Sequence, residues 1–140
     1  MDECSAMTPD ARLACCCMSE SYEFLVGEPV NQVWVWGPIR LVIESEGKAA
    51  SVDLLRLGFT DPTGRSMEID AVRQPSEAGP LLDLISKRVT FAKSADGTLL
   101  LRFDDGSEVR AYPDDRYESW AVVSDGRTFQ CLPGGEVMSW

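Results

Sequence analysis

The sequence contains no histidine in its 140 residues. Histidine is the usual general base for a serine or cysteine nucleophile and the commonest metal ligand, so its absence excludes Ser-His and Cys-His hydrolase sites. The sequence also has no glycine-rich motif that could cradle a phosphate. We therefore expect a protein that is not an enzyme and that holds no cofactor.

Cysteine is nearly absent beyond the first 17 residues: Cys4 and Cys15–Cys17 lie near the start, and only Cys131 lies elsewhere. This spacing lacks the two ligand pairs that a zinc site needs, so no metal site is expected. Charged residues near the start exclude a lipoprotein signal, and five cysteines without a secretion signal point to the reducing cytoplasm. Residues 1–19 are interpreted as a flexible tail before one domain at 20–140.

Basic residues are the minority. The chain has 13 Lys and Arg against 23 Asp and Glu, a formal net charge of -10, and a pI near 4.4. Such a surface repels nucleic acid and anionic membranes. A charged partner of this protein is therefore expected to be basic.

Short runs of alternating apolar and polar residues, separated by turn residues, dominate the chain from Lys87 to Trp140. Runs of this kind predict an antiparallel meander. Similar runs recur between residues 22 and 72. The expected fold class is α+β and β-rich, with mostly antiparallel meander sheets and one short helix.

The register of several hairpins can be predicted. A three-residue loop at Asp104–Gly106 keeps the apolar residues of its two strands on one face, and it pairs Leu101 with Val109. By the same test, a loop at Ser94–Asp96 lets Val89 face Leu101. Two-residue turns are predicted at residues 125–126 and 46–47. They pair Val122 with Phe129 and Leu41 with Val52.

The predicted helix covers residues 80–87. Pro80 suits the first helical turn, and an apolar stripe follows it. The stripe consists of Leu81, Leu84 and Ile85. A helix of two turns cannot stand alone, so it is expected to lie across the sheet.

Two further patterns each leave an alternative open. Trp34 and Trp36 share one face of a predicted strand; a core position is favoured, and an exposed binding ridge is the alternative. The segments Gly37–Glu44 and Gly97–Asp104 resemble each other position for position. This likeness suggests two related halves, 31–72 and 88–140, although ordinary hairpins also resemble one another.

Acidic residues gather between positions 104 and 118. This cluster consists of Asp104, Asp105, Asp114, Asp115 and Glu118. Carboxylates there could hold a hard cation or act as acid and base. Ordinary turn composition is the favoured explanation for them.

The C-terminal third resembles a small bacterial family of unknown function. The likeness rests on the strand from Leu99 to Phe103, on Tyr117-Glu118-x-Trp120, on Cys131-Leu-Pro-Gly-Gly-Glu136 and on the final tryptophan. More loosely, the chain resembles the compact acidic immunity proteins encoded beside bacterial polymorphic toxins. Those proteins neutralise a toxin domain by covering its active site, and the resemblance implies a similar role here.

The resulting hypothesis is an immunity or antitoxin-type protein that occludes a basic toxin domain, binding neither nucleic acid nor membrane. An acidic face would speed encounter and aromatic residues would anchor the contact. The predicted partner-binding residues are Asp104, Asp105, Asp114, Asp115, Glu118, Asp125, Tyr112, Tyr117 and Trp34. The alternative is a stand-alone module that binds a small ligand between helix and sheet or has a regulatory role.

Overall fold

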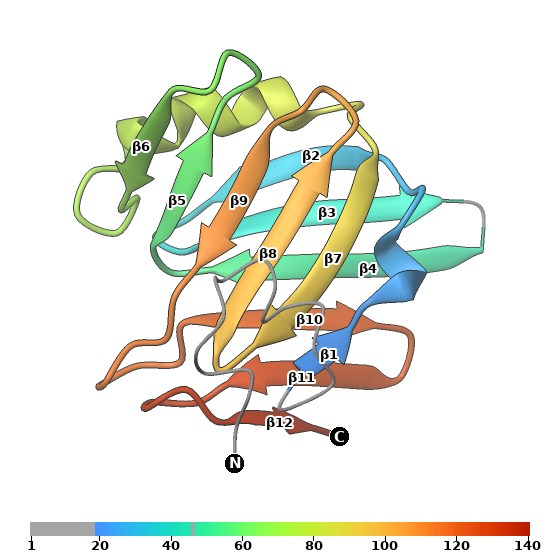
Figure 1. Cartoon of the computed structure of the whole chain (residues 1–140), viewed down its shortest axis with the longest axis vertical. Helices are drawn as coiled ribbons and strands as arrows, with labels where there is room; N and C mark the ends of the chain where they lie inside the picture. The colour runs from blue at the N-terminus through green and yellow to red at the C-terminus, as the bar shows by residue number, and fades with distance from the viewer. Residues whose placement is uncertain (1–18, 46) are drawn as a thin grey trace.

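The computed structural model describes residues 19–45 and 47–140, and in these ranges twelve strands form two antiparallel sheets of six (Figure 1). The strands are β1 (Ser19–Ser21), β2 (Val30–Val35), β3 (Ile39–Ser45), β4 (Lys48–Leu54), β5 (Leu57–Thr60), β6 (Ser66–Ile69), β7 (Val89–Ala95), β8 (Thr98–Phe103), β9 (Glu108–Ala111), β10 (Trp120–Ser124), β11 (Arg127–Cys131) and β12 (Val137–Ser139). Two 3₁₀ helices, η2 (Glu23–Leu25) and η3 (Pro75–Leu84), complete the described elements. The predicted β-rich α+β fold is confirmed.

The two sheets pack face to face and cross steeply (Figure 1). The front sheet has the order β1-β7-β8-β9-β5-β6, and the back sheet has the order β12-β11-β10-β4-β3-β2. Side chains alternate along every strand, so each sheet buries one face against the other. Leu41, Val52 and Val122 of the back sheet and Leu99, Leu101 and Val109 of the front sheet are wholly buried in this shared core.

The chain contributes to each sheet twice. A three-stranded meander in one sheet is followed by a hairpin in the other, and the same order then repeats with the two sheets exchanged. The meander β2-β3-β4 lies in the back sheet and is followed by β5-β6 in the front sheet; the meander β7-β8-β9 lies in the front sheet and is followed by β10-β11 in the back sheet. The similar segments 37–44 and 97–104 fall on β3 and β8, the middle strands of the two meanders. The two proposed halves thus occupy equivalent places in the topology.

Three predicted registers are confirmed. Leu101 pairs with Val109 across the turn at Gly106, whose φ of 89° only glycine adopts easily. The other two confirmed pairs are Val122 with Phe129 and Leu41 with Val52. In each case burial of one face is enough to specify the pairing, because a slip of one residue would turn the apolar side chains to solvent.

The predicted hairpin at Ser94–Asp96 is wrong. The observed turn is the two-residue Asp96–Gly97, where φ is 51° and 83°, and it pairs Ser94 with Leu99 and Ala92 with Leu101. Apolar alternation disfavours this register because it buries Ser94. The structure allows that burial, since the hydroxyls of Ser94 and Tyr22 lie 2.8 Å apart and share a hydrogen bond.

A β-bulge between Val89 and Phe91 completes the change of register. The bulge returns Val89 to the core, where it pairs with Phe103 instead of the predicted Leu101. Phe91 then lies on the outer face of the front sheet, with Ala95 and the buried Leu100. One extra residue thus reverses the inward and outward positions along the strand.

The helix η3 begins five residues earlier than predicted and ends at Leu84. Its first residue is Pro75, while Pro80 lies inside it. Its buried residues are Ala78, Leu81 and Leu84, at a spacing of three that suits the 3.0 residues per turn of a 3₁₀ helix. The predicted stripe assumed 3.6 residues per turn, and Ile85 is therefore exposed and not part of the stripe.

Candidate functional site

The structure places the predicted acidic residues in separate parts of the molecule. Asp104 and Asp105 lie in the β8–β9 turn, and Asp114 and Asp115 lie beyond the other end of β9. Asp125 lies in the β10–β11 turn, at the ends of two inner strands of the back sheet. The predicted residues therefore do not form one continuous acidic face.

Hydrogen bonds to the chain account for two of these carboxylates. Asp105 Oδ1 accepts hydrogen bonds from the backbone N–H of Ser107 at 2.9 Å and from its hydroxyl. Asp104 Oδ1 accepts from the backbone N–H of Arg88 at 3.2 Å. The carboxylate of Asp105 thus holds its own turn, as the composition of the turn indicated, whereas that of Asp104 binds the chain just before β7.

Asp114 organises the loop between β9 and β10. Its Oδ1 accepts hydrogen bonds from the N–H of Arg116 at 2.7 Å and of Tyr117 at 3.0 Å, and its other oxygen forms an ion pair with Arg56. The hydrogen bond from Arg116 is the largest cause that lowers the pKa of Asp114, and Tyr117 and Arg56 act in the same direction. Asp114 is thus a structural element of this loop.

This arrangement predicts a pH response of the loop. The pKa of Asp114 is lower in the folded chain than its ordinary value of 3.8, so its stabilising contribution is complete above about pH 4 and is lost as pH falls through the lowered pKa. An NMR titration should give a midpoint below 3.8 for this carboxyl, and the amide signals of Arg116 and Tyr117 should follow it. In Asp114→Asn these amide signals should stay constant, and a normal midpoint would contradict the assignment.

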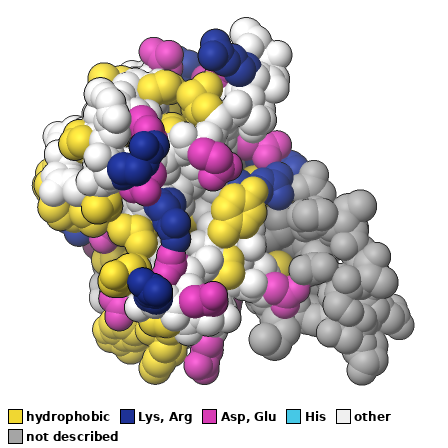
Figure 2. Space-filling model, turned by 90° about the vertical axis from the view of Figure 1, so that its left-hand side faces the viewer, with side chains coloured by type: hydrophobic (Ala, Val, Ile, Leu, Met, Phe, Trp, Pro, Cys, Tyr) yellow, Lys and Arg dark blue, Asp and Glu magenta, His cyan; other side chains and the backbone are white. Residues whose placement is uncertain are grey.

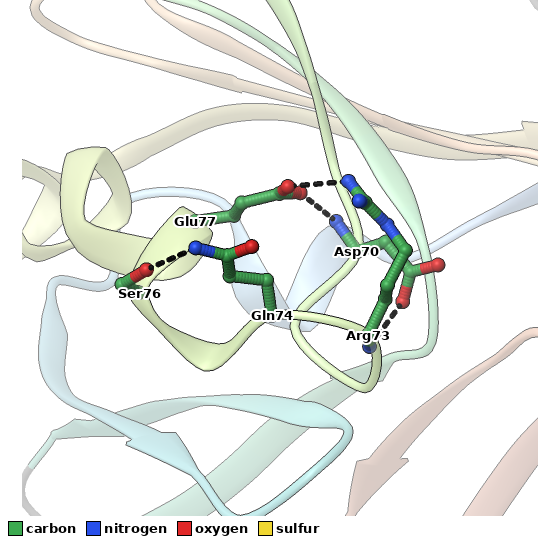
Figure 3. Close-up of polar contacts among 5 residues, drawn as sticks. All are labelled: Asp70, Arg73, Gln74, Ser76 and Glu77. Carbon is green, nitrogen blue, oxygen red and sulfur yellow. Dashed lines mark hydrogen bonds and ion pairs between the residues drawn. The ribbon is translucent and has the colours of Figure 1, made fainter.

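The same loop forms one wall of an open cleft of about 810 Å³. The cleft is lined by Leu55, Arg56, Asp70, Val72, Pro113, Asp114, Asp115, Arg116 and Tyr117. Its opposite wall is fixed by a network at the start of η3, in which Glu77 accepts hydrogen bonds from the backbone N–H of Asp70 and from the guanidinium of Arg73 (Figure 3). In this network the Arg73 N–H also donates to Asp70 Oδ1.

The cleft differs from the pocket that the sequence suggested, because no residue of η3 lines it. Its charges are mixed: two arginines face three aspartates. Figure 2, which views the left-hand side of Figure 1, shows basic side chains next to acidic ones with hydrophobic side chains between them. Tyr117 is exposed at the cleft, while Tyr112 is exposed at the end of β9.

A second candidate surface lies on the outer face of the back sheet. Trp34 and Trp36 are 46% and 55% exposed, so the favoured prediction that they belong to the core is wrong. Between them lies Arg40, whose guanidinium carbon is 5.5 Å from the Trp34 ring centroid and 5.1 Å from the Trp36 ring centroid. Arg40 is thus placed for cation–π contact with both rings.

Asp53 holds Arg40 in this position. The Arg40 Nε and one terminal nitrogen donate to the two carboxylate oxygens at 2.6 and 3.1 Å, and this contact is the largest cause that raises the pKa of Arg40. Trp34 is further fixed by a hydrogen bond from its ring N–H to Gln32. The outer face therefore presents two aromatic rings that are already ordered before any partner binds.

The remaining charges on this face are acidic. Two shallow hollows of about 450 and 150 Å³ lie over the sheet, and the charged residues that line them are Arg40, Asp53, Glu44, Glu118 and Asp125. One cation against four carboxylates gives a formal charge of -3. Of the predicted binding residues, the structure brings Trp34, Glu118 and Asp125 to this face.

Trp36 and Arg40 were not among the predicted binding residues, although the sequence contained a signal for Arg40. With Ile39, Leu41 and Ile43 directed inward, strict alternation sends Arg40 outward. The observed pairing of Trp34 with Arg40 follows from the turn at Gly37, where φ is 131°. What the pattern could not reveal is that Trp34 and Trp36 stay exposed on this face.

Metal sites and membrane spans are both absent from the described residues. No group of three or more Cys, Asp or Glu side chains in ranges 19–45 and 47–140 is placed to hold a metal ion. In the same part of the chain, no helix has the length and apolar composition required to cross a membrane. The cysteines at positions 4 and 15–17 lie outside the described residues, as does most of the proposed tail. Ser19, which was assigned to that tail, belongs to β1.

Comparison with known proteins identifies a family but no function. Searches of curated proteins and of solved structures each returned no significant match. A family model of unknown function matches residues 23–140, which agrees with the predicted likeness to a small family of that kind. Because the match spans most of its length, the chain belongs to the DUF6188 family, a family of unknown function.

Proposed function

We propose that this protein is an immunity-type binding protein that acts in the cytoplasm and neutralises a basic toxin domain by covering its active site. The observation that carries the proposal is the outer face of the back sheet, where Trp34 and Trp36 stand exposed around Arg40 among acidic side chains. Tryptophan and arginine are the residue types that most often dominate binding energy at protein interfaces. A free surface with two ordered tryptophans is well suited to such a role.

The physical basis of binding would have two parts. The two rings would supply buried apolar area at little entropic cost, since Arg40 and Gln32 already hold them. The carboxylates around them would attract a cationic surface and raise the association rate. Added salt should therefore slow association more than it speeds dissociation.

The test is co-expression with the product of the adjacent reading frame, with cell growth and co-purification as readouts. We expect the wild-type chain to restore growth and to co-purify. The double variant Trp34→Ala and Trp36→Ala should lose protection, because each ring is expected to contribute at least about tenfold in affinity. Circular dichroism should show an intact fold, since neither ring belongs to the core.

Tyr112→Ala is the matched control. Tyr112 is an exposed aromatic residue at the end of β9, in the front sheet, and its exposure of 48% is close to that of Trp34. Although the sequence predicted Tyr112 as a binding residue, it follows a strand of the front sheet and not of the proposed face, so its loss should leave protection unchanged. Equal protection by the tryptophan variant and the wild type would refute the proposed binding face.

A second candidate is a small-ligand or regulatory module. The observation that favours it is the cleft of about 810 Å³, a size typical of ligand sites, which is lined by the apolar Leu55 and Val72 together with charged side chains. A ligand bound there should shift the NMR signals of Tyr117 and leave those of Trp34 unchanged. The pattern of shifts thus separates the two candidates.

A further inference from the structure

The edge strand β2 is unlike the three other edges of the two sheets. β1, β6 and β12 are three, four and three residues long, whereas β2 has six residues. Proteins usually protect a long edge with charged residues or proline, because unpaired backbone groups invite another strand. The sequence of β2, Val-Asn-Gln-Val-Trp-Val, contains neither, and Trp34 and Val35 are exposed.

The backbone of β2 offers hydrogen-bonding groups along this edge. Trp36 N–H donates to Pro38 O. By the alternation of an antiparallel pair, the backbone N–H and C=O of Trp34 then point toward β3, and those of Val33 and Val35 point away from it. At the start of the strand, the outward groups of Val30 are bonded to Ser86 and Lys87. In the described part of the chain, no segment forms backbone hydrogen bonds with this edge after Val30, although η3 packs beside β2 (Figure 1).

The surroundings of the free edge define what it could accept. On its outer side lie the two tryptophans and, on the next strand, Arg40, which is paired with Asp53, and the exposed carboxylate of Glu44. At its start, Ile85 at the end of η3 bridges to Val30, and the side chain of Ile85 is exposed. A strand added here would therefore meet aromatic and acidic groups on one face and apolar groups near η3.

We infer that the partner supplies an extended segment of alternating basic and apolar residues, which pairs with residues 32–36 of β2 as a seventh strand of the back sheet. This inference rests on the proposed function, in which the partner is basic. Backbone hydrogen bonds would supply affinity, and a basic side chain near Glu44 together with apolar contact with the ring of Trp34 would supply specificity. A second copy of this chain fits less well, because pairing two β2 edges brings together two acidic faces.

The probe is an acetylated and amidated hexapeptide of alternating arginine and valine, titrated against the full chain and followed by tryptophan fluorescence. We expect binding, together with slower hydrogen exchange at the amides of Val33 and Val35. Val35→Pro should weaken binding at least about tenfold, since proline removes an outward N–H that an edge strand can lose without losing an internal bond. A peptide that is N-methylated at alternate residues should bind as weakly to the wild-type chain as the unmodified peptide binds to Val35→Pro. This second measurement requires no change in the protein.

Ser139→Pro is the matched control, because it lies on the opposite edge of the same sheet. Thr128 and Trp140 exchange both backbone hydrogen bonds. Ser139, which precedes Trp140 on β12, therefore directs its N–H away from β11. This variant should bind as the wild type does.

Three outcomes would overturn the inference. If Val35→Pro and the N-methylated peptide leave affinity unchanged while Trp34→Ala lowers it, the edge inference fails and the proposed function stands. If the peptide does not bind, the edge inference fails, and the co-expression test decides the proposed function separately. A self-association in sedimentation experiments that disappears in Val35→Pro would assign the edge to a second copy instead.

Discussion

Gly97→Ala is expected to lower the free energy of unfolding by about 3 kcal/mol, a large share of the stability of a small domain. Gly97 has a φ of 83°, and a left-handed conformation costs a residue with a Cβ roughly 1–2 kcal/mol. The new Cβ would also lie 2.8 Å from the carbonyl oxygen and 2.9 Å from the Cα of Gly135. Overpacking against such backbone atoms costs roughly 1–3 kcal/mol more.

The surroundings of Gly97 prevent the two turns from moving apart to relieve this overlap. Gly97 lies in the β7–β8 turn of the front sheet, and Gly135 lies in the β11–β12 turn of the back sheet. Gly97 O also accepts a hydrogen bond at 2.9 Å from the ring N–H of the buried Trp120. The neighbouring Gly134 donates its N–H to Asp114 O, so a shift of this turn would reach the cleft.

Urea unfolding is the measurement, with Gly126→Ala as the matched control. Gly126 has a similar φ of 74° in the β10–β11 turn, but a Cβ there would meet nothing within 4 Å. The control should lose only the conformational part, roughly 1–2 kcal/mol. Equal losses in the two variants would show that the contact with Gly135 costs nothing.

The fold could be predicted as far as burial and turn chemistry determine it. The pairing of Leu101 with Val109 is specified because any slip exposes apolar side chains. The β7–β8 register could not be predicted in this way, because it depends on Tyr22, a residue 72 positions from Ser94 in the sequence. A polar side chain can be buried when a distant partner satisfies it, and alternation does not reveal that partner.

The candidate site was less predictable than the fold. Asp105 and Asp114 are close in the sequence, yet they lie at opposite ends of β9 because a strand carries the chain across the sheet. Glu118 lies on the back sheet, where it accepts a hydrogen bond from Gln130 at 2.9 Å. Nearness in sequence therefore did not produce one acidic surface.

The exposed tryptophans show a second limit of prediction from the sequence. Composition favours burial for a large aromatic residue, and alternation only states that Trp34 and Trp36 share a face. Whether that face is covered depends on which elements lie over the sheet, and sequence periodicity contains no information on this. The structure leaves the face open and places Arg40 and Asp53 on it, so the residues with the strongest case for binding became visible only in three dimensions.

Tyr22 links the two sheets from a position just before η2. Its ring is fully buried, with edge-on contacts to Phe24, Trp120 and Phe129 at centroid distances of 6.2, 6.4 and 5.1 Å. Its N–H donates to Ala92 O at 2.9 Å, and its hydroxyl shares a hydrogen bond with Ser94. Burial raises the pKa of this hydroxyl, which therefore remains protonated and able to bond Ser94.

Tyr22→Ala is accordingly expected to cost about 3–5 kcal/mol, the range for removing a large aromatic side chain from a core. The loss combines the transfer of the ring with the cavity left between Phe129 of the back sheet and Ser94 of the front sheet. Tyr22→Phe keeps the ring and leaves only the Ser94 hydroxyl without its partner, so it should cost about 1 kcal/mol. Urea midpoints of the two variants measure both values. A similar loss in both would show that the hydrogen bond, and not the packing of the ring, holds the two sheets together at this point.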